Sequence, residues 1–294
     1  MEQTIKNHAN WQFLSSFWLK IIAFLTMTVD HLGLMLLLYY YDVSDPRVVV
    51  LRSIGRIALP LFCFMIFEGT MKTKHFGKYA LRLGILTIII SIAVGVMVYT
   101  DMGFPRNIGN IFMDLLLGAT GVYFLKRKEW YLKPIALLPL VIAVLSTVAN
   151  NIEVTQGTMI HWFPPIFRLQ YHYYGILMIY GFYLMYLFKN FLLGIYAKNI
   201  GVDEESIKGT PIDRTLENIL CAIVIFTATI VFYYFSFNLN ELHGTQLWAI
   251  ASGALLLFYN GQRGYNRKWF QYGSYLYYPI HIGILALIFY LLTK

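Results

Sequence analysis

Long apolar runs recur along the chain at the length that a membrane-spanning helix needs. A helix rises 1.5 Å per residue, so about 20 apolar residues cross the roughly 30 Å hydrocarbon layer of a bilayer. Reading for such runs predicts about nine helices. They lie near residues 17–41, 48–69, 79–99, 108–125, 134–149, 173–196, 219–237, 245–259 and 272–292. The pattern therefore predicts an all-α, polytopic membrane protein whose residues 1–294 form one transmembrane domain.

Three stretches leave the number of spans open. The runs at 134–149 and 245–259 are short, and each is either a tilted span or a partly re-entrant segment. The stretch MIHWFPPIFRLQY, at 159–171, is aromatic and interrupted by two prolines. If it forms a further helix, the chain has ten spans instead of nine.

Composition supports a membrane protein and excludes several other classes. The chain is 58% hydrophobic and 13% charged, with a mean hydropathy of +0.59, whereas about a quarter of the residues of a soluble domain are charged. The net charge of +8 does not come from a basic stripe, so no nucleic-acid partner is expected. Cys63 and Cys221 lie in apolar runs and predict neither a disulfide nor a metal site. No cleavable signal peptide is expected, because the first 17 residues are mixed polar and aromatic.

Lysine and arginine gather in alternate connections between the runs, and this bias predicts the topology. Most of the 23 basic residues lie on one side, at Lys6 and Lys20 and in the connections near 72–82, 126–133, 189–214 and 263–268. Basic connections stay on the cytoplasmic side of the plasma (inner) membrane. The N-terminus is therefore predicted to be cytoplasmic and, with nine spans, the C-terminus lies outside.

The first predicted span carries polar residues near its middle, where a charge costs at least ~2.5–3.5 kcal/mol on insertion scales. Asp30 and His31 lie there, and Lys20 marks the cytoplasmic end. Close to three helical turns separate Lys20 from His31, so the two share a face and lie about 16 Å apart along the axis. Asp30 lies about 100° around the helix from His31, and it is predicted to pair with an arginine of a neighbouring helix. Lys20 is either an ordinary positive-inside anchor or a binding residue.

The second predicted span offers such an arginine. Arg52 and Arg56 lie four residues apart and hence on one face. Snorkelling to the outer surface is favoured for Arg52, and pairing for the deeper Arg56. Gly55 allows another helix to approach closely, and Pro60 interrupts the backbone hydrogen bonds of the helix.

Two further spans carry polar residues at depth. Asn110 and Asp114 lie one turn apart in the fourth span, and His281 lies near the middle of the last span, with Tyr277 or Tyr278 on or near its face. His31 and His281 are predicted to lie at similar depth, which permits contact without establishing it. We expect a cavity to be lined by Arg52 together with Asn110, Asp114, Tyr277, Tyr278 and His281.

Four segments, in this order, resemble the TraX family of membrane proteins, whose namesake is associated with N-acetylation of conjugative pilin. They are LTMTVDHLG in the first span, RSIGRIALPLFCFMIFEGT in the second, NIFMDLLLG beginning at Asn110, and YYPIHIGIL in the last. The first segment is also similar to that of the membrane acyltransferases that modify surface glycans, in which ten residues separate a basic residue from a histidine. Here these two are Lys20 and His31. In that wider group the histidine is implicated in acyl transfer from cytosolic acyl-CoA to an acceptor across the membrane.

The resemblance and the polar residues lead to one hypothesis for function. The chain is expected to be a membrane acetyltransferase, or short-chain acyltransferase, that uses cytosolic acetyl-CoA as donor substrate, with no metal. His31 is the expected base, or the carrier of an acyl group, and Lys20 would hold a phosphate of acyl-CoA. Arg56, the glycine-preceded arginine of the second segment, would pair with Asp30 or stabilise developing charge. The acceptor is a hydroxyl or amine of a peptide, a glycan or a lipid, and membrane lipid surrounds the protein.

Two other classes remain open on the sequence alone. A transporter or flippase would use Asp30, His31, Asp114 and His281 as a proton relay, although no internal repeat of the kind common in transporters is evident. A non-catalytic assembly factor would use the same residues for helix packing and would show no saturable binding of CoA. A metal site built from the four residues has no ligand spacing in its favour.

Overall fold

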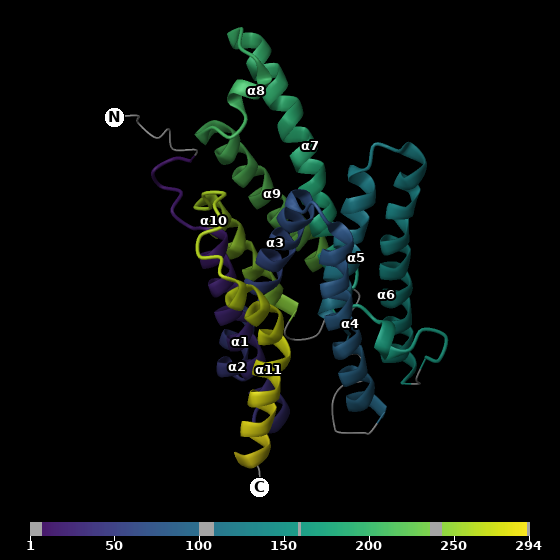
Figure 1. The fold of residues 1–294 in the computed structure, drawn as a ribbon. Helices are drawn as coiled ribbons and strands as arrows, with labels where there is room; N and C mark the ends of the chain where they lie inside the picture. The colour runs from purple at the N-terminus through teal and green to yellow at the C-terminus, as the bar shows by residue number, and fades with distance from the viewer. Residues whose placement is uncertain (1–7, 100–108, 158–159, 236–242, 293–294) are drawn as a thin grey trace. The chain divides into compact units, whose positions relative to one another are not determined.

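The fold is described from a computed structural model for residues 8–99, 109–157, 160–235 and 243–292 (Figure 1). The regular elements in these ranges are helices: α1 (Ser16–Tyr39), α2 (Pro46–Gly55), α3 (Ala58–Lys72), α4 (Phe76–Tyr99), α5 (Ile111–Lys126), η1 (Trp130–Leu137), α6 (Leu138–Gln156), η2 (Pro165–Phe167), α7 (Tyr174–Ile200), α8 (Glu204–Ile207), α9 (Pro211–Phe235), η3 (His243–Ile250), α10 (Ala251–Leu257) and α11 (Lys268–Leu292). The chain divides into two compact units, one formed by Met1–Phe62 with Gly181–Lys294 and the other by Cys63–Tyr180.

Among the described residues, seven helical segments are long and apolar enough to cross a membrane, so the chain is a multi-pass membrane protein. They are Ser16–Tyr39, Pro46–Lys72, Phe76–Tyr99, Trp130–Gln156, Tyr174–Ile200, Pro211–Phe235 and Lys268–Leu292. The predicted fourth and eighth spans correspond to shorter helices, α5 with 16 residues and the segment Gly244–Leu257. Within the described residues 160–171, regular structure is limited to the single turn η2. A tenth span is therefore not found there.

The second span is interrupted where the sequence predicted it. Helix α2 ends at Gly55, α3 begins at Ala58, and the two residues between them form a turn. Pro60 has no N–H to donate to the carbonyl four residues earlier, and its ring crowds that carbonyl, which belongs to Arg56. The position of Pro60 thus accounts for the break. At the other end of α2, Asp45 accepts a hydrogen bond from the Arg47 backbone N–H at 2.9 Å and caps the helix.

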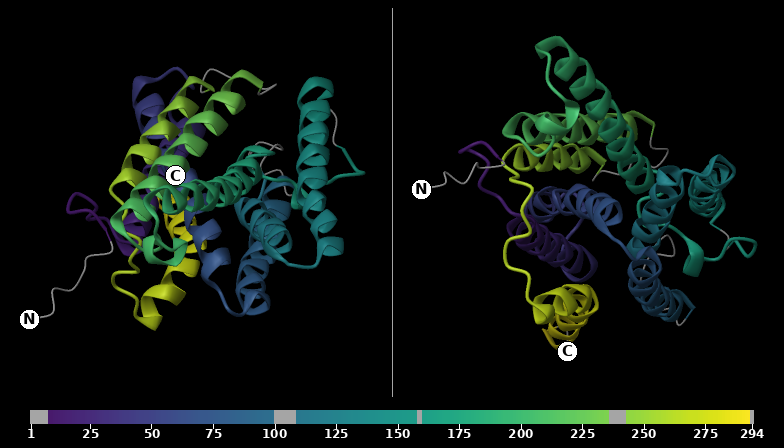
Figure 2. Two further views of the ribbon diagram at one scale, coloured as in Figure 1. Left: turned by 90° about the horizontal axis from the view of Figure 1, so that it is seen from above. Right: turned by 45° about the horizontal axis from the view of Figure 1, so that its top comes forward.

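Helices α1 and α11 run parallel, side by side, in the first unit (Figure 2). The Lys20 ammonium lies 5.4 Å from the centre of the Phe270 ring, His31 contacts His281, and the ring of Tyr39 lies 5.9 Å from that of Phe289. Each contact joins residues 250 positions apart, a constant offset that only parallel helices produce. If both helices cross the bilayer, the chain makes an odd number of crossings from one to the other. Counted from α1 to α11 inclusive, the seven segments named above and the predicted nine spans both satisfy this condition, and ten spans do not.

Connections that the sequence placed on one side of the membrane lie together within each unit. In the first unit, the backbone of Leu14 donates to Phe258 and accepts from Asn260, at 2.9 and 2.8 Å. The chain before α1 therefore joins the chain before α11. In the second unit, the Lys126 ammonium donates to the carbonyl oxygen of Met71 at 2.9 Å, which joins the ends of α3 and α5. This grouping agrees with the alternation of basic connections.

A loop between α6 and α7 closes the opposite end of the second unit. The Arg168 guanidinium pairs with the Glu153 carboxylate at 2.5 Å, and the two side chains are 1% and 6% exposed. The carbonyl oxygen of Arg168 accepts from the Asn110 backbone N–H at 2.9 Å, and the Leu169 N–H donates to Ser146 Oγ at 2.9 Å. Because a buried charge left unpaired is costly, this ion pair ties the loop to α6.

The same loop contains a histidine that is held neutral. Burial, reinforced by the positive charge of Arg168, lowers the pKa of His172 to about 4. The unfolded value is about 6.5, so the stability that the neutral ring contributes is fully present above pH 6.5 and is lost as the pH falls towards 4. Since φ of His172 is 54°, asparagine fits this position. We expect the melting temperature of His172→Asn to fall less than that of the wild type between pH 7 and pH 4.5. Equal declines in the two proteins would contradict this assignment.

Candidate functional site around His31 and His281

Two imidazole rings meet between α1 and α11. The distance from His281 Nε2 to His31 Nδ1 is 2.9 Å, a hydrogen-bond length. The other nitrogen of His281, Nδ1, lies 2.8 Å from the backbone carbonyl oxygen of Tyr277. The two histidines that were predicted at similar depth are therefore in direct contact.

The two predicted tyrosines hold this pair in place. The Tyr277 ring stacks on His281 with centroids 5.0 Å apart, and its hydroxyl lies 2.6 Å from Thr28 Oγ1. The Tyr278 ring approaches both imidazoles edge-on, at 5.6 Å from each. His281 is buried, with 7% exposed, whereas His31 is partly exposed. His31 thus has more exposed surface than His281.

Asp30 faces α2, whereas His31 faces α11. The predicted angle of about 100° between the two residues around α1 accounts for this difference. Its carboxylate pairs with the Arg52 guanidinium at 2.5 Å, and the side chains of Asp30 and Arg52 are 11% and 14% exposed. The interpretation of Arg52 as a snorkelling residue is therefore wrong. The Arg56 Nε donates to Thr245 Oγ1 at 3.3 Å, so Arg56 turns towards η3. The physical reason is the break after Gly55, which ends the regular helical spacing of the two arginines.

The close approach predicted at Gly55 is occupied by Asp30. A Cβ atom added at Gly55 would collide with the Cβ and the Oδ1 of Asp30. Any larger residue at position 55 would displace the carboxylate from Arg52. Glycine is therefore required here for the ion pair between α1 and α2 to form.

Lys20 lies on the face of α1 that His31 occupies, because both side chains contact α11. The Lys20 ammonium lies above the Phe270 ring, eleven positions before His31 on a helix that rises 1.5 Å per residue. The site therefore has a cation at one end of α1 and an imidazole about 16 Å further along the same face.

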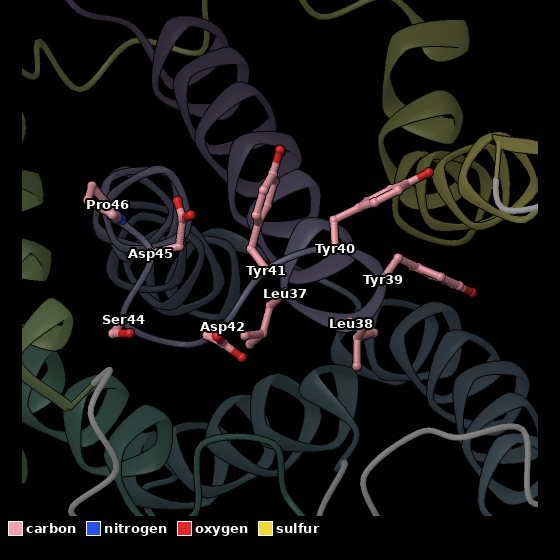
Figure 3. Close-up of a pocket in the computed structure, with 9 residues that line it drawn as sticks. All are labelled: Leu37, Leu38, Tyr39, Tyr40, Tyr41, Asp42, Ser44, Asp45 and Pro46. Carbon is pink, nitrogen blue, oxygen red and sulfur yellow. The ribbon is translucent and has the colours of Figure 1, made fainter.

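A cavity of 540 Å³ opens at the far end of α1 (Figure 3). It is lined by residues that share the turn from α1 into α2: Leu37, Leu38, Tyr39, Tyr40, Tyr41, Asp42, Ser44, Asp45 and Pro46. The Tyr41 hydroxyl accepts a hydrogen bond from Arg47 at 2.7 Å. Tyr39 follows His31 by eight residues, about 12 Å along the helix axis.

Asn110 and Asp114 belong to the second unit, where their side chains accept hydrogen bonds from backbone N–H groups. Asn110 caps α5 by accepting from the Phe112 N–H at 2.9 Å. The fully buried Asp114 carboxylate accepts from the backbone N–H groups of Gln170 and Tyr171, at 2.8 and 3.2 Å. Within this unit the Asp114 side chain thus fixes the loop before α7, whereas the Asn110 side chain caps α5 and joins it to α4 by donating to the Thr87 carbonyl oxygen at 2.7 Å.

The sequence analysis missed the ion pair of Arg168 and Glu153. Arg168 lies in the stretch 159–171, and its signal was an arginine that closely follows two prolines and an aromatic residue. Among the residues that the structure describes, no group of three or more His, Cys, Asp or Glu side chains is arranged to hold a metal ion.

The arrangement on α1 and α2 coincides with a region shared with known proteins. Residues 15–192, more than half of the chain, match the family described as TraX protein. The chain belongs to the TraX family. The TraX match includes Lys20, Asp30, His31 and Arg52, whereas His281 lies beyond it.

Two curated proteins are similar to part of this TraX chain. One is an uncharacterized protein, RP591, from Rickettsia prowazekii (strain Madrid E), 33% identical over 124 residues that cover 42% of this chain and 41% of the relative. The other is named a probable fimbrial assembly protein, FimC of serogroup H1, from Dichelobacter nodosus. It is 34% identical over 111 residues that cover 35% of this chain and 43% of the relative. The chain therefore matches less than half the length of either relative. No solved structure matches it.

Proposed function

We propose that this TraX-family protein is a membrane acetyltransferase that uses acetyl-CoA from the cytoplasm. One observation carries the proposal: the partly exposed imidazole of His31 is hydrogen-bonded to a second, buried imidazole. A base whose ring is oriented by a hydrogen bond to another group is the arrangement that general-base catalysis of acyl transfer needs. The N-terminus is cytoplasmic in this proposal and the membrane is the inner membrane, in accord with the basic connections.

The donor enters along the face of α1 that carries Lys20. Acetyl-CoA bears phosphate groups at one end and the thioester at the other. Lys20 at the cytoplasmic end binds a phosphate, while the thioester reaches towards His31 about 16 Å deeper. The lysine is a point charge with three donors, which suits phosphate without fixing its orientation. This assigns one face of α1 to the donor.

The chemical step then follows from the groups around His31. His31 takes the proton of the acceptor hydroxyl or amine as that group attacks the thioester carbonyl. The resulting tetrahedral intermediate carries a negative charge, and its collapse breaks the carbon–sulfur bond and releases CoA, which takes up the proton from His31. Arg52 is held by Asp30, so we assign the developing charge to Arg56.

The acceptor approaches from the opposite end of α1. The cavity lined by Tyr39, Tyr40 and Asp42 lies on that side of His31. The relative from Dichelobacter nodosus bears the name of a probable fimbrial assembly protein. This favours an amine or hydroxyl of a protein acceptor over one of a glycan or a lipid.

Acetyl-CoA binding tests the proposal directly. Purified protein in detergent is expected to gain thermal stability with acetyl-CoA in a saturable way, by about 2.7 kcal/mol at 100 times the Kd. It should also hydrolyse acetyl-CoA slowly. Lys20→Gln is expected to raise KM for acetyl-CoA roughly tenfold, equivalent to about 1.4 kcal/mol, with kcat unchanged.

Lys74→Gln is the matched control, because Lys74 is exposed in the connection between α3 and α4. It should leave KM unchanged. Absence of stabilisation at millimolar acetyl-CoA would reject the enzyme and favour a transporter. Equal effects of the two lysine variants would reject the assignment of Lys20.

A further inference from the structure

We propose that His281 is a positioning residue that holds His31 in the tautomer protonated at Nδ1, so that His31 Nε2 is the atom that accepts the proton. This inference rests on the proposed function for its catalytic consequence, but its structural part stands on its own. It concerns a residue of α11 that lies beyond residues 15–192, the range that matches the family.

The argument begins with the hydrogen bond of His281 to the backbone. A carbonyl oxygen only accepts hydrogen bonds, so the 2.8 Å contact between His281 Nδ1 and the Tyr277 carbonyl requires a proton on Nδ1. A neutral imidazole carries one proton. The second nitrogen of His281, Nε2, then presents a lone pair and can only accept.

The lone pair on His281 Nε2 determines which nitrogen of His31 carries the proton. The 2.9 Å contact between the two rings needs one proton between the nitrogens. Since His281 Nε2 has none, the donor is His31 Nδ1. A neutral His31 with its proton on Nδ1 has an unprotonated Nε2, and this is the atom free to act as a base. The Tyr277 carbonyl thus sets the tautomers of two rings in succession.

Burial and packing make the neutral state of His281 the favoured one. In the opposite assignment, His281 Nε2 would donate to His31 Nδ1. Both nitrogens of His281 would then carry protons, which requires a positive charge on a ring that is 7% exposed and stacked on Tyr277. Charging a buried group inside a membrane span is costly. Its ionisable neighbours in the contact are His31 and the two tyrosines, none of which is an anion at neutral pH.

The parallel register of α1 and α11 keeps the geometry constant. The Phe24 and Tyr277 rings stack with centroids 4.4 Å apart, Phe24 about two turns before His31 and Tyr277 about one turn before His281. The hydroxyls of Thr28 and Tyr277 lie 2.6 Å apart. These contacts fix the rotation of both helices around the imidazole pair. When His31 accepts a proton during transfer, its Nδ1–H still points at the His281 lone pair, which stabilises the cation.

Nitrogen NMR of the full-length protein labelled with ¹⁵N-histidine reads the tautomers without any substrate. Protonated and unprotonated ring nitrogens have distinct chemical shifts, and comparison with His31→Ala assigns the signals of His31. We expect His31 Nδ1 to be protonated and Nε2 unprotonated at neutral pH. A His31 protonated at Nε2 would overturn the inference, whatever the activity of the protein.

A matched pair of variants at position 281 tests the catalytic consequence. His281→Gln keeps a hydrogen-bond acceptor at about the place of Nε2, whereas His281→Met fills the same space with only a weak acceptor. We expect His281→Met to lower kcat about 100-fold with KM for acetyl-CoA unchanged, and His281→Gln to stay within about tenfold of the wild type. Equal kcat values for the two variants would overturn the positioning role. If the wild type transfers no acetyl group, the proposed function fails, and the NMR result alone decides the tautomer.

Discussion

Replacing His31 with alanine is expected to reduce acetyl transfer at least about 100-fold, because general-base catalysis contributes about 10²–10⁴ to a rate. The protein should still fold and insert. His31 is partly exposed, and the ion pair that joins α1 to α2 uses Asp30 and Arg52 instead. Acetyl-CoA should still bind, since Lys20 remains. Transfer is measured as release of the CoA thiol, and binding as thermal stabilisation by acetyl-CoA.

The matched control for this variant is His75→Ala. His75 is exposed in the connection between α3 and α4, so its loss should leave both rate and binding unchanged. Full activity of His31→Ala would remove His31 as the base of the mechanism, and another residue would then have to take the proton of the acceptor. Loss of acetyl-CoA stabilisation in His31→Ala would indicate that the histidine binds the donor instead of activating the acceptor.

Breaking the ion pair between Asp30 and Arg52 is expected to destabilise the fold by roughly 3–5 kcal/mol, because removal of one partner leaves the other buried and unpaired. Asp30→Asn preserves the shape of the side chain, so it suits the narrow space beside Gly55. Arg52→Gln removes the positive charge of the same ion pair. The free energy of unfolding is measured by denaturant titration in detergent micelles.

The double variant Asp30→Asn with Arg52→Gln tests whether the two residues stabilise the fold through their interaction with each other. We expect it to lose clearly less stability than the sum of the two single variants, because no charge is then left without a partner. Glu205→Gln is the control at an exposed pair: Glu205 contacts Lys208 at 2.7 Å, and the two side chains are 73% and 40% exposed. Its cost should stay below about 1 kcal/mol. Additive losses at Asp30 and Arg52 would show that the two residues act independently.

Much of the fold followed from the one-dimensional pattern. Apolar length predicted helices, and seven of the nine predicted runs correspond to segments long and apolar enough to cross a membrane among the described residues. The interruption by Pro60 and the close approach at Gly55 were predictable because each depends on local backbone chemistry. The face shared by Lys20 and His31 was predictable because helical geometry is rigid over a few turns.

The candidate site was predictable only in part. His31 and His281 were expected at equal depth, but depth is one coordinate, and contact also depends on which helices are neighbours and how each is rotated. The choice between Arg52 and Arg56 as partner of Asp30 failed for a related reason. The turn between α2 and α3 changes the direction of one arginine relative to the other, and helical spacing does not hold across a turn.

The sequence by itself determined that this is a helical membrane protein of the TraX type, which stretches form its long helices, and which side chains share a face. These properties depend on hydrophobicity and on the backbone within a few residues. Only the tertiary structure decided that α1 and α11 lie parallel, that two imidazoles 250 residues apart share a hydrogen bond, and that Arg52 neutralises Asp30. Such pairings depend on helix packing, which brings together residues whose spacing along the chain carries no signal.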